Sequence, residues 1–217
     1  MHPTTALFIL FQSALSTAAP HIYSALPNRD AFTPPAIVST SFSGNGCPQG
    51  TTEASTAGPW KHFSFYLPSF KVETGPSISV AERTVNCQAH INFGASTKTG
   101  WQFALKDHWS RGHFEIDGAG VTLTQYLTVY FSQDAANTTT TAQSVSSTDN
   151  LPHSKELKLH TSIPEAALVW SPCSGAGILN VNFRMAFTGA TNNVTAYYGA
   201  GKNSSVSEQW GWTWRRC

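Results

Sequence analysis

The densest group of residues that could do chemistry lies between positions 101 and 114 (WQFALKDHWSRGHF). Aromatic rings alternate there with hydrogen-bonding and charged groups around a predicted glycine turn; the candidates are Trp101, Lys106, Asp107, His108, Trp109, Arg111 and His113. Two smaller groups accompany it, which are Lys61, His62 and Tyr66, and the pair Tyr126 and Tyr130. Together these side chains would form a pocket with an apolar wall and a few donors, which suits a small apolar molecule.

Packing offers a plainer interpretation of the same residues. Tyr126 and Tyr130 share the non-core face of a predicted strand, so the aromatic rings could cover the second face of a sheet while the charges occupy loops. Against this alternative we assign two sets of roles as hypotheses. The catalytic candidates are Lys61, His62, His108, Arg111 and His113, and the substrate-binding candidates are Tyr66, Trp101, Trp109, Tyr126 and Tyr130.

The familiar motifs of hydrolases, metalloenzymes and nucleotide-binding proteins are absent from the sequence. There is no GxSxG, HExxH, glycine-rich phosphate loop, EF-hand or CxxC pair. We therefore expect no cofactor and no metal. One alternative stays open: trimming to His21 would let its α-amine and ring bind copper together with His108 or His113.

Composition narrows the classes of partner. The chain has 217 residues, of which 13 are Lys or Arg and 12 are Asp or Glu, so the formal net charge is +1 and charged residues make up 12%. A nucleic-acid binder needs a basic face to neutralise phosphates, so no nucleic-acid partner is expected. The 41% of hydrophobic residues is enough for one sizeable core, and the length suits a single domain.

The first 18 residues are typical of a secretory signal peptide. An apolar run at positions 6–11 is followed by Ser16 and Ala18 at the small-residue positions that cleavage after Ala18 requires. A buried N-terminal strand or helix is the alternative. The run is too short to span a bilayer, so we expect no membrane span and an extracellular protein. Sequons at Asn137, Asn193 and Asn203 predict glycosylation. The oligomeric state stays open.

The four cysteines agree with secretion. An even number in an oxidising compartment favours disulfides over metal ligands or nucleophiles. Four cysteines allow three connectivities. We favour Cys47–Cys87 with Cys173–Cys217, because each pair lies within one half of the chain.

Period-two alternation predicts the elements that position these residues. Apolar residues alternate with polar ones over 84–93, 121–131 and 179–187, and again at Trp210, Trp212 and Trp214; weaker strands are expected at 62–70, 101–106, 114–116 and 157–163. No window has helical spacing with a capping signal, so little helix is expected. The prediction is an all-β protein, a single-domain antiparallel β-sandwich or flattened barrel over 46–217 with two disulfides.

Two further segments have their own predictions. Residues 19–45 are Pro-rich and aperiodic, which indicates an extended arm or a propeptide. Residues 133–150 are a run of Ser, Thr, Asn and Gln, which predicts a mobile surface loop.

Six landmarks occur in a recognisable order along the chain. They are Gly46-Cys47-Pro48-Gln49-Gly50, Asn86-Cys87-Gln88, Gly100-Trp101-Gln102-Phe103, Arg111-Gly112, Ser171-Pro172-Cys173 and Trp214-Arg215-Arg216-Cys217. In this series the chain resembles a family of small secreted fungal proteins that is catalogued mainly as a domain of unknown function. The resemblance covers nearly the whole mature chain, from about Ser43 to Cys217. It implies a β-sandwich tied by disulfides.

The resemblance extends to the hetero-Diels–Alderases of fungal tropolone–sesquiterpenoid pathways. It implies a cofactor-free pericyclase that joins a tropolone-derived o-quinone methide to a sesquiterpene alkene. Proximity could lower such a barrier by up to about 7–11 kcal/mol, and a donor to the quinone-methide oxygen by about 2.7–4 kcal/mol. A histidine would serve as the acid–base group if the enzyme also formed the quinone methide.

Two alternatives to catalysis stay open. Relatives of this type are also regarded as effectors or cell-surface proteins, so the chain could be a secreted glycan- or apolar-ligand-binding protein, or it could be purely structural. Secretion is expected of a binder or effector more than of a pathway enzyme. A closed, mostly apolar cavity with two or three convergent donors would favour the enzyme, and a flat, exposed row of Trp on one face would favour glycan binding.

Overall fold

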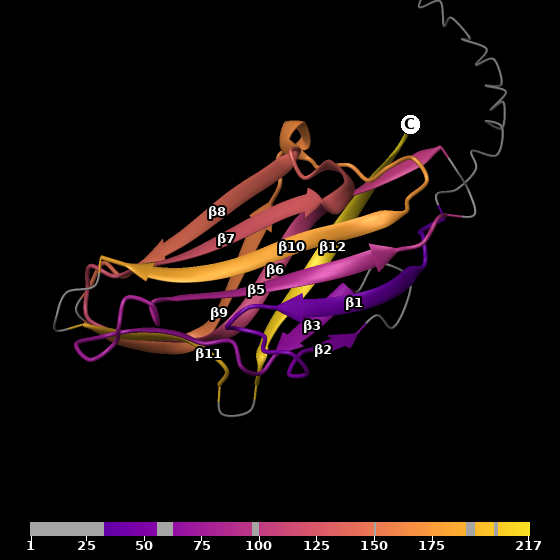
Figure 1. Ribbon diagram of the computed structural model, residues 1–217. Helices are drawn as coiled ribbons and strands as arrows, with labels where there is room; N and C mark the ends of the chain where they lie inside the picture. The colour runs from indigo at the N-terminus through magenta and orange to yellow at the C-terminus, as the bar shows by residue number, and fades with distance from the viewer. Residues whose placement is uncertain (1–32, 56–62, 97–99, 150, 190–193, 202–203) are drawn as a thin grey trace, which may run out of the picture. The chain divides into compact units, whose positions relative to one another are not determined.

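The computed structural model describes residues 33–55, 63–96, 100–149, 151–189, 194–201 and 204–217 (Figure 1). Several predictions fall outside these residues: the signal peptide over 1–18, the arm up to residue 32, and the side chains of Lys61, His62, Asn193 and Asn203. None of the helices formed by the described residues has the length and apolarity needed to cross a membrane.

Two antiparallel sheets form the fold. The five-stranded sheet has the order β1 (Ile37–Ser43), β5 (Thr84–Phe93), β10 (Gly177–Thr188), β7 (Thr122–Phe131) and β8 (Thr138–Ser146). The seven-stranded sheet has the order β2 (Glu53–Ser55), β3 (Phe63–Leu67), β12 (Val206–Arg216), β6 (Trp101–Asp117), β11 (Thr195–Gly199) and β4 (Val72–Thr74), and β9 (Pro152–Ser162) pairs with β6. In Figure 1 the five-stranded sheet lies in front, and β6, β9 and β12 cross behind it.

The two sheets enclose one core, as the alternation predicts. Every second residue of β5, from Val85 to Phe93, is buried, and the same holds for β10 from Leu179 to Phe187. The sheets do not close on themselves, so the fold is a β-sandwich and not a barrel. Helix is confined, among the described residues, to two short 3₁₀ turns at Ser132–Asp134 and Glu165–Ala167.

The predicted surface loop over 133–150 is wrong in its central part, because β8 occupies Thr138–Ser146 and pairs with β7. Hydroxyl pairs join the two strands, including Thr124 Oγ1 and Ser144 Oγ at 2.9 Å and Thr128 Oγ1 and Thr140 Oγ1 at 2.9 Å. β8 is the last strand of its sheet and buries no apolar face, so no alternation of apolar and polar residues marks it. Threonine nonetheless favours strands because its branched side chain suits a pleated surface.

The sheet also begins earlier than the predicted boundary at residue 46. Residues 37–43, assigned above to the extended arm, form β1 and pair with β5 from Phe93 back to Gln88. The strand begins only two residues after Pro35, so the Pro-rich composition at the start of this segment conceals it.

One long strand, β6, replaces the two short strands and the glycine turn predicted between 101 and 116. Gly112 lies inside this strand, where a Cβ atom would come within 2.7 Å of Cζ of Tyr198. The glycine therefore provides space for the buried Tyr198 ring rather than a change of chain direction.

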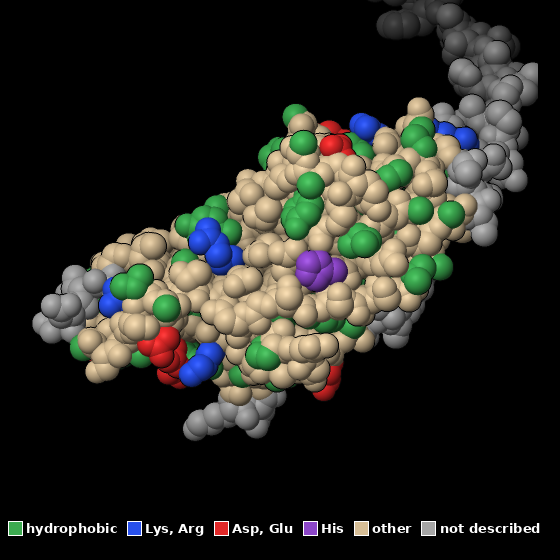
Figure 2. Space-filling view, in the orientation of Figure 1, with side chains coloured by type: hydrophobic (Ala, Val, Ile, Leu, Met, Phe, Trp, Pro, Cys, Tyr) green, Lys and Arg blue, Asp and Glu red, His purple; other side chains and the backbone are tan. Residues whose placement is uncertain are grey.

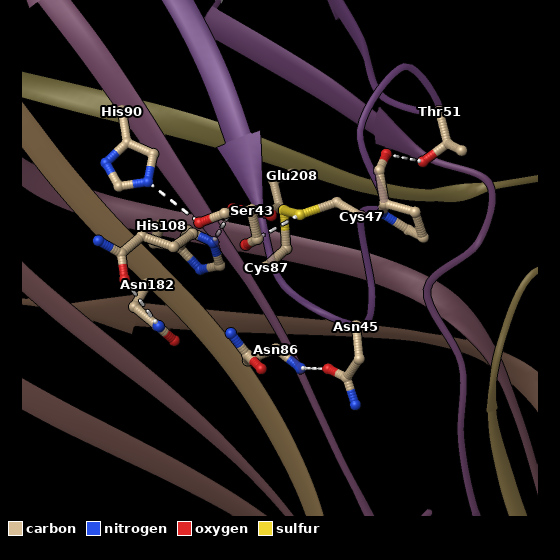
Figure 3. The surroundings of a disulfide bond; sticks show 12 residues. Ser43, Asn45, Cys47, Thr51, Asn86, Cys87, His90, His108, Asn182 and Glu208 are labelled. Carbon is tan, nitrogen blue, oxygen red and sulfur yellow. Dashed lines mark hydrogen bonds and ion pairs between the residues drawn. A yellow bond between two sulfur atoms is a disulfide. The ribbon is translucent and has the colours of Figure 1, made fainter.

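Both favoured disulfides are present. Cys47–Cys87 links the loop after β1 to β5, with Cα atoms 5.3 Å apart and both residues buried (Figure 3). Beside it the side chain of Asn45 accepts a hydrogen bond from the backbone N–H of Asn86 at 2.8 Å. Cys173–Cys217 ties the segment before β10 to the C-terminal residue, and both of its cysteines are exposed.

Candidate functional site

Exposed aromatic and polar side chains come together in a groove on the outer face of the seven-stranded sheet. We call it the Trp109 groove; its volume is about 460 Å³ and it is open to solvent. The lining side chains that face outward are Ser64, Tyr66, Trp109, Arg111, Lys158, Ser207 and Gln209. They come from four strands that are distant in sequence.

The strand register places these residues in two neighbouring rows. In one row Tyr66 of β3, Ser207 of β12, Arg111 of β6 and Lys158 of β9 are successive cross-strand partners. In the other row the partners are Ser64, Gln209, Trp109 and His160. Because side chains alternate between faces along a strand, both rows project from the same outer face.

Trp109 is held in one orientation by its neighbours. Its ring stacks on His160, with centroids 4.7 Å apart and planes inclined by 6°, and Nε2 of His160 lies 2.9 Å from Oδ1 of Asp107. The other end of the indole lies over Gly211, where a Cβ atom would come within 3.1 Å of the ring. Trp109 is still 37% exposed, so part of the indole is available to a ligand.

Tyr66 is the second exposed ring of the groove, at 44% exposure. Between Tyr66 and the β6 side chains lie Ser207 and Gln209, which are small or flexible and carry hydroxyl and amide groups. The groove therefore combines two amphipathic rings with a polar floor. Such a surface can contact the apolar face of a ligand ring and donate to, or accept hydrogen bonds from, its polar edge.

A chain of polar contacts runs along β6 and β9 in this part of the face. Arg111 Nε donates to Oε2 of Glu156 at 2.9 Å, and Oε1 of Glu156 lies 3.9 Å from Nδ1 of His113. Nε2 of His113 lies 2.7 Å from Oε1 of Glu115. His113, a predicted catalytic residue, is thus engaged by carboxylates on both ring nitrogens and does not line the Trp109 groove.

A second and larger groove lies at the other end of the same sheet face. We call it the acidic groove; its volume is about 730 Å³, and its lining includes Glu73, Glu115, Asp117, His153 and Tyr197. Partial burial raises the pKa of Tyr197 above its ordinary value, and the charges of Glu73 and Glu115 add to the shift. The Tyr197 hydroxyl donates to the carbonyl oxygen of Ala200 at 2.9 Å.

His108 lies between the sheets and has no exposed surface. Its Nε2 is 2.8 Å from Oε2 of Glu208, which also accepts a hydrogen bond from Trp210 Nε1 at 3.2 Å. Gln125, which projects from β7 of the other sheet, donates to Thr161 Oγ1 at 2.7 Å and lies 3.5 Å from Nδ1 of His108. This buried network joins the two sheets. Glu208 is among the residues that line the Trp109 groove, whereas His108 is not.

Sequence reasoning missed Gln125, although a signal for it existed. Position 125 falls on the apolar face of the 121–131 alternation, and a polar residue there is fully buried. A buried amide must find partners because an unpaired polar group in a core is costly, so this break in the pattern indicates an internal hydrogen-bond network.

The remaining predicted binding residues lie elsewhere. Trp101, at the start of β6, carries the guanidinium of Arg216 over its ring at 4.6 Å. Tyr126 and Tyr130 lie on the outer face of the five-stranded sheet, where Arg184 sits 4.0 Å from the Tyr126 ring and Gln88 Nε2 donates to the Tyr130 hydroxyl at 3.1 Å. Figure 2 shows this face, on which few charged side chains gather. Of the predicted site residues, the structure brings Tyr66, Trp109 and Arg111 together.

The structure also bears on the predicted glycosylation sites and on metal binding. Asn137 is exposed in the turn before β8, a position that is open to glycosylation. Among the described residues, no group of three or more His, Cys, Asp or Glu side chains is arranged to hold a metal ion.

Comparisons with known proteins address the family. Residues 34–217 match the model of the family described as Domain of unknown function (DUF4360). A relative in Arthroderma benhamiae, an uncharacterized secreted protein, is 30% identical over 157 residues, which is 72% of this chain and 61% of the relative. The chain thus spans about 61% of the length of that relative. This relative supports the predicted extracellular localisation.

Two solved structures were also matched. TmCBM61, solved in complex with β-1,4-galactotriose, has a TM-score of 0.23 at 10% identity, with 83% of this chain and 90% of that chain covered. The enzymatically active domain of tailspike protein 4 of bacteriophage CBA120 has a TM-score of 0.22 at 12% identity, with 80% of this chain and 19% of that chain covered. Scores this low do not establish a shared fold.

Proposed function

This chain belongs to the family described as Domain of unknown function (DUF4360), whose model spans nearly all of its described residues, and with that premise we propose that it is a secreted carbohydrate-binding protein. The binding surface is the Trp109 groove. The observation that carries the proposal is the exposure of Trp109 and Tyr66 on either side of a hydroxyl- and amide-bearing floor.

Trp109, Tyr66 and Trp214 are the exposed Trp and Tyr side chains among the described residues, and the first two lie in the Trp109 groove. Trp210, Phe65 and Phe103 are almost fully buried in the core, and most other Trp and Tyr side chains of the described residues are at least partly covered. Keeping a Trp and a Tyr on the surface gives up the free energy of burying them, about 1.5–3 kcal/mol for a large apolar side chain. That cost is offset if the rings contact a ligand.

The chemistry of the groove suits a sugar better than a wholly apolar ligand. A pyranose ring presents C–H groups on its faces, which pack on an aromatic ring, and hydroxyl groups on its edge. Ser207, Gln209 and Ser64 can bond to those hydroxyls from the floor of the groove. Trp and Tyr have few rotatable bonds, so they supply contact area at a low cost in conformational entropy.

The shape of the groove indicates that the ligand is held on a surface rather than enclosed. Its volume of about 460 Å³ lies within the usual range of small-molecule sites, roughly 300–1,000 Å³, and it opens to solvent along the sheet. A segment of an oligosaccharide can lie in such a groove while the rest of its chain continues outside.

Binding of soluble oligosaccharides and retention on insoluble polysaccharides test the proposal. The secreted, glycosylated protein is compared with Trp109→Ala and Tyr66→Ala, and we expect each substitution to weaken binding at least about tenfold, which is about 1.4 kcal/mol. Trp214→Ala is the matched control, because Trp214 is also exposed but lies outside the groove, near the C-terminus. Absence of carbohydrate binding by the unaltered protein, or equal binding by all variants, would contradict the proposal.

Cycloaddition catalysis is a second candidate function, and the acidic groove is the feature that favours it. A volume of about 730 Å³ could accommodate two joined reactants, with Ile78 and Pro76 as apolar walls. The test is incubation with the quinone-methide precursor and the alkene alcohol. A product yield and stereochemistry equal to those of the protein-free reaction would rule this function out.

A further inference from the structure

We propose that the carbohydrate held in the Trp109 groove carries an anionic group, a carboxylate or a sulfate, which Lys158 and Arg111 bind. The inference rests on the proposed function and names the class of sugar. Both cationic side chains line the groove and both are exposed, Arg111 at 54% of its side chain.

The relative placement of the two cations is the first argument. Arg111 and Lys158 are direct cross-strand partners in the β6–β9 pair and project from the same face. Like charges directly opposite each other destabilise an antiparallel pair, so this arrangement has a cost in the free protein. An anion bound between the two side chains would remove that cost.

The ion pair beside Arg111 and Lys158 offsets only one of their two positive charges. Glu156 accepts from Arg111 Nε at 2.9 Å and offsets one of the two cations. Lys158 forms no ion pair or side-chain hydrogen bond with any residue that the structure describes. The guanidinium of Arg111 forms no other hydrogen bond within the same residues, so its terminal nitrogens can still donate to a planar carboxylate or to a sulfate.

The distribution of charge over the whole sheet face is the second argument. The acidic groove concentrates Glu73, Glu115 and Asp117 at the end of β6 beyond Arg111. The carboxylate among the residues of the Trp109 groove is that of Glu208, which is buried and lies against His108. An anionic sugar is therefore attracted to the end of the Trp109 groove where Lys158 and Arg111 lie. It is repelled by the acidic groove and by Glu53, the exposed cross-strand partner of Tyr66 at the opposite end of the Trp109 groove.

Calorimetry with matched sugars tests the inference on the full secreted chain. The probes are an oligogalacturonate, the same oligomer with its carboxylates methyl-esterified, and a sulfated heparin oligosaccharide. We expect at least one anionic oligomer to bind about tenfold or more tightly than the neutral ester, and we expect this preference to shrink when salt is raised from 0.05 to 0.5 M. The better of the two anionic probes identifies the group as carboxylate or sulfate.

The variant Lys158→Gln should lower the ratio of anionic to ester affinity toward one. Lys155→Gln is the matched control, because Lys155 is an exposed lysine of the same strand outside the groove, and it should leave the ratio unchanged. Tight, Trp109-dependent binding with equal affinity for charged and neutral oligomers overturns this inference and leaves carbohydrate binding intact. If the protein binds neither these probes nor any other carbohydrate, both this inference and the proposed function are overturned.

Discussion

The ring of His160 lies flat on the indole of Trp109, with centroids 4.7 Å apart and planes inclined by 6°. The two residues are direct partners across the β6–β9 pair, and Nε2 of the imidazole lies 2.9 Å from Oδ1 of Asp107. The exposed indole of the groove is thereby supported by a neighbour that does not itself line the groove. His160 is a positioning residue for the proposed binding surface.

Replacing His160 with alanine should weaken carbohydrate binding without unfolding the protein. The stacked pair is worth about 0.5–1.5 kcal/mol beyond its buried area, which corresponds to roughly two- to tenfold in affinity. Quenching of Trp fluorescence by acrylamide should increase as the indole loses its cover. His153→Ala is the control, since His153 lies on the same strand and contacts Asp149. Unchanged affinity and unchanged quenching in His160→Ala would show that the stacking has no role.

Breaking the buried pair of His108 and Glu208 should destabilise the protein strongly without altering its surface. Glu208→Ala leaves the Nε2 of the fully buried His108 and the Nε1–H of Trp210 without their carboxylate partner, and each buried polar group left unpaired costs about 1–3 kcal/mol in the free energy of unfolding. Urea unfolding measures the effect. The double variant His108→Leu/Glu208→Leu, which buries no ionisable group at either position, should lose less than Glu208→Ala. The exposed Glu53→Ala should change stability by less than about 0.5 kcal/mol, and a Glu208→Ala protein as stable as this control would contradict the role of the pair.

The two disulfides should differ in their resistance to reduction under native conditions. Cys47 and Cys87 are buried, whereas Cys173 and Cys217 are exposed, so a thiolate can reach the second bond without unfolding of the core. Brief treatment with dithiothreitol followed by alkylation and mass spectrometry should label Cys173 and Cys217 first. Equal labelling rates for all four cysteines would contradict this order. Removing Cys47 and Cys87 together should cost about 2–5 kcal/mol of stability.

The free energy of unfolding should decrease at high pH, in part because of the buried phenol of Tyr198. Burial, with the charges of Glu208 and Glu156 in addition, raises the pKa of the Tyr198 phenol above its ordinary value. Above about pH 10 the unfolded chain therefore loses this proton while the folded chain keeps it, so the unfolded state binds fewer protons and the free energy of unfolding decreases as pH rises. Below that pH the phenol is neutral in both states and contributes no pH dependence.

The comparison of Tyr198→Phe with the unaltered protein isolates this effect. The difference in the free energy of unfolding between the two should be constant from pH 7 to 9 and should move in favour of the Phe variant from pH 10 upward. The titrations of other groups cancel in the difference. Parallel pH profiles for both proteins would show that Tyr198 titrates normally in the folded state.

Local alternation determined which residues of several strands share a face. In β5 and β10 the apolar residues recur at every second position, and each predicted face is buried. Within one strand the period of the side chains depends on backbone geometry alone, so the sequence is sufficient for this inference. The favoured pairing of the four cysteines within the two halves of the chain is also confirmed, with bonds that join residues 40 and 44 positions apart.

Only the tertiary structure decided that His108 is buried and that its neighbour Trp109 is exposed. Around β6 the alternation is interrupted: Phe103, Ala104 and Leu105 are all buried, and Gly211 of β12 pairs with Asp107 while Trp212 pairs with Leu105, which leaves Lys106 as an extra residue. This bulge shifts the phase, so that His108 faces the core and Trp109 faces solvent. The sequence of β6 alone contains apolar residues in both phases and does not choose between them.

The groove itself likewise depends on the pairing of distant strands. Tyr66, Ser207, Arg111 and Lys158 lie far apart along the chain and become neighbours because β3, β12, β6 and β9 pair in one particular register. A sequence determines which side chains project together from a strand, since that is a property of the local backbone. Which other strands lie beside it, and which surface their side chains then build, is decided by the packing of the whole core.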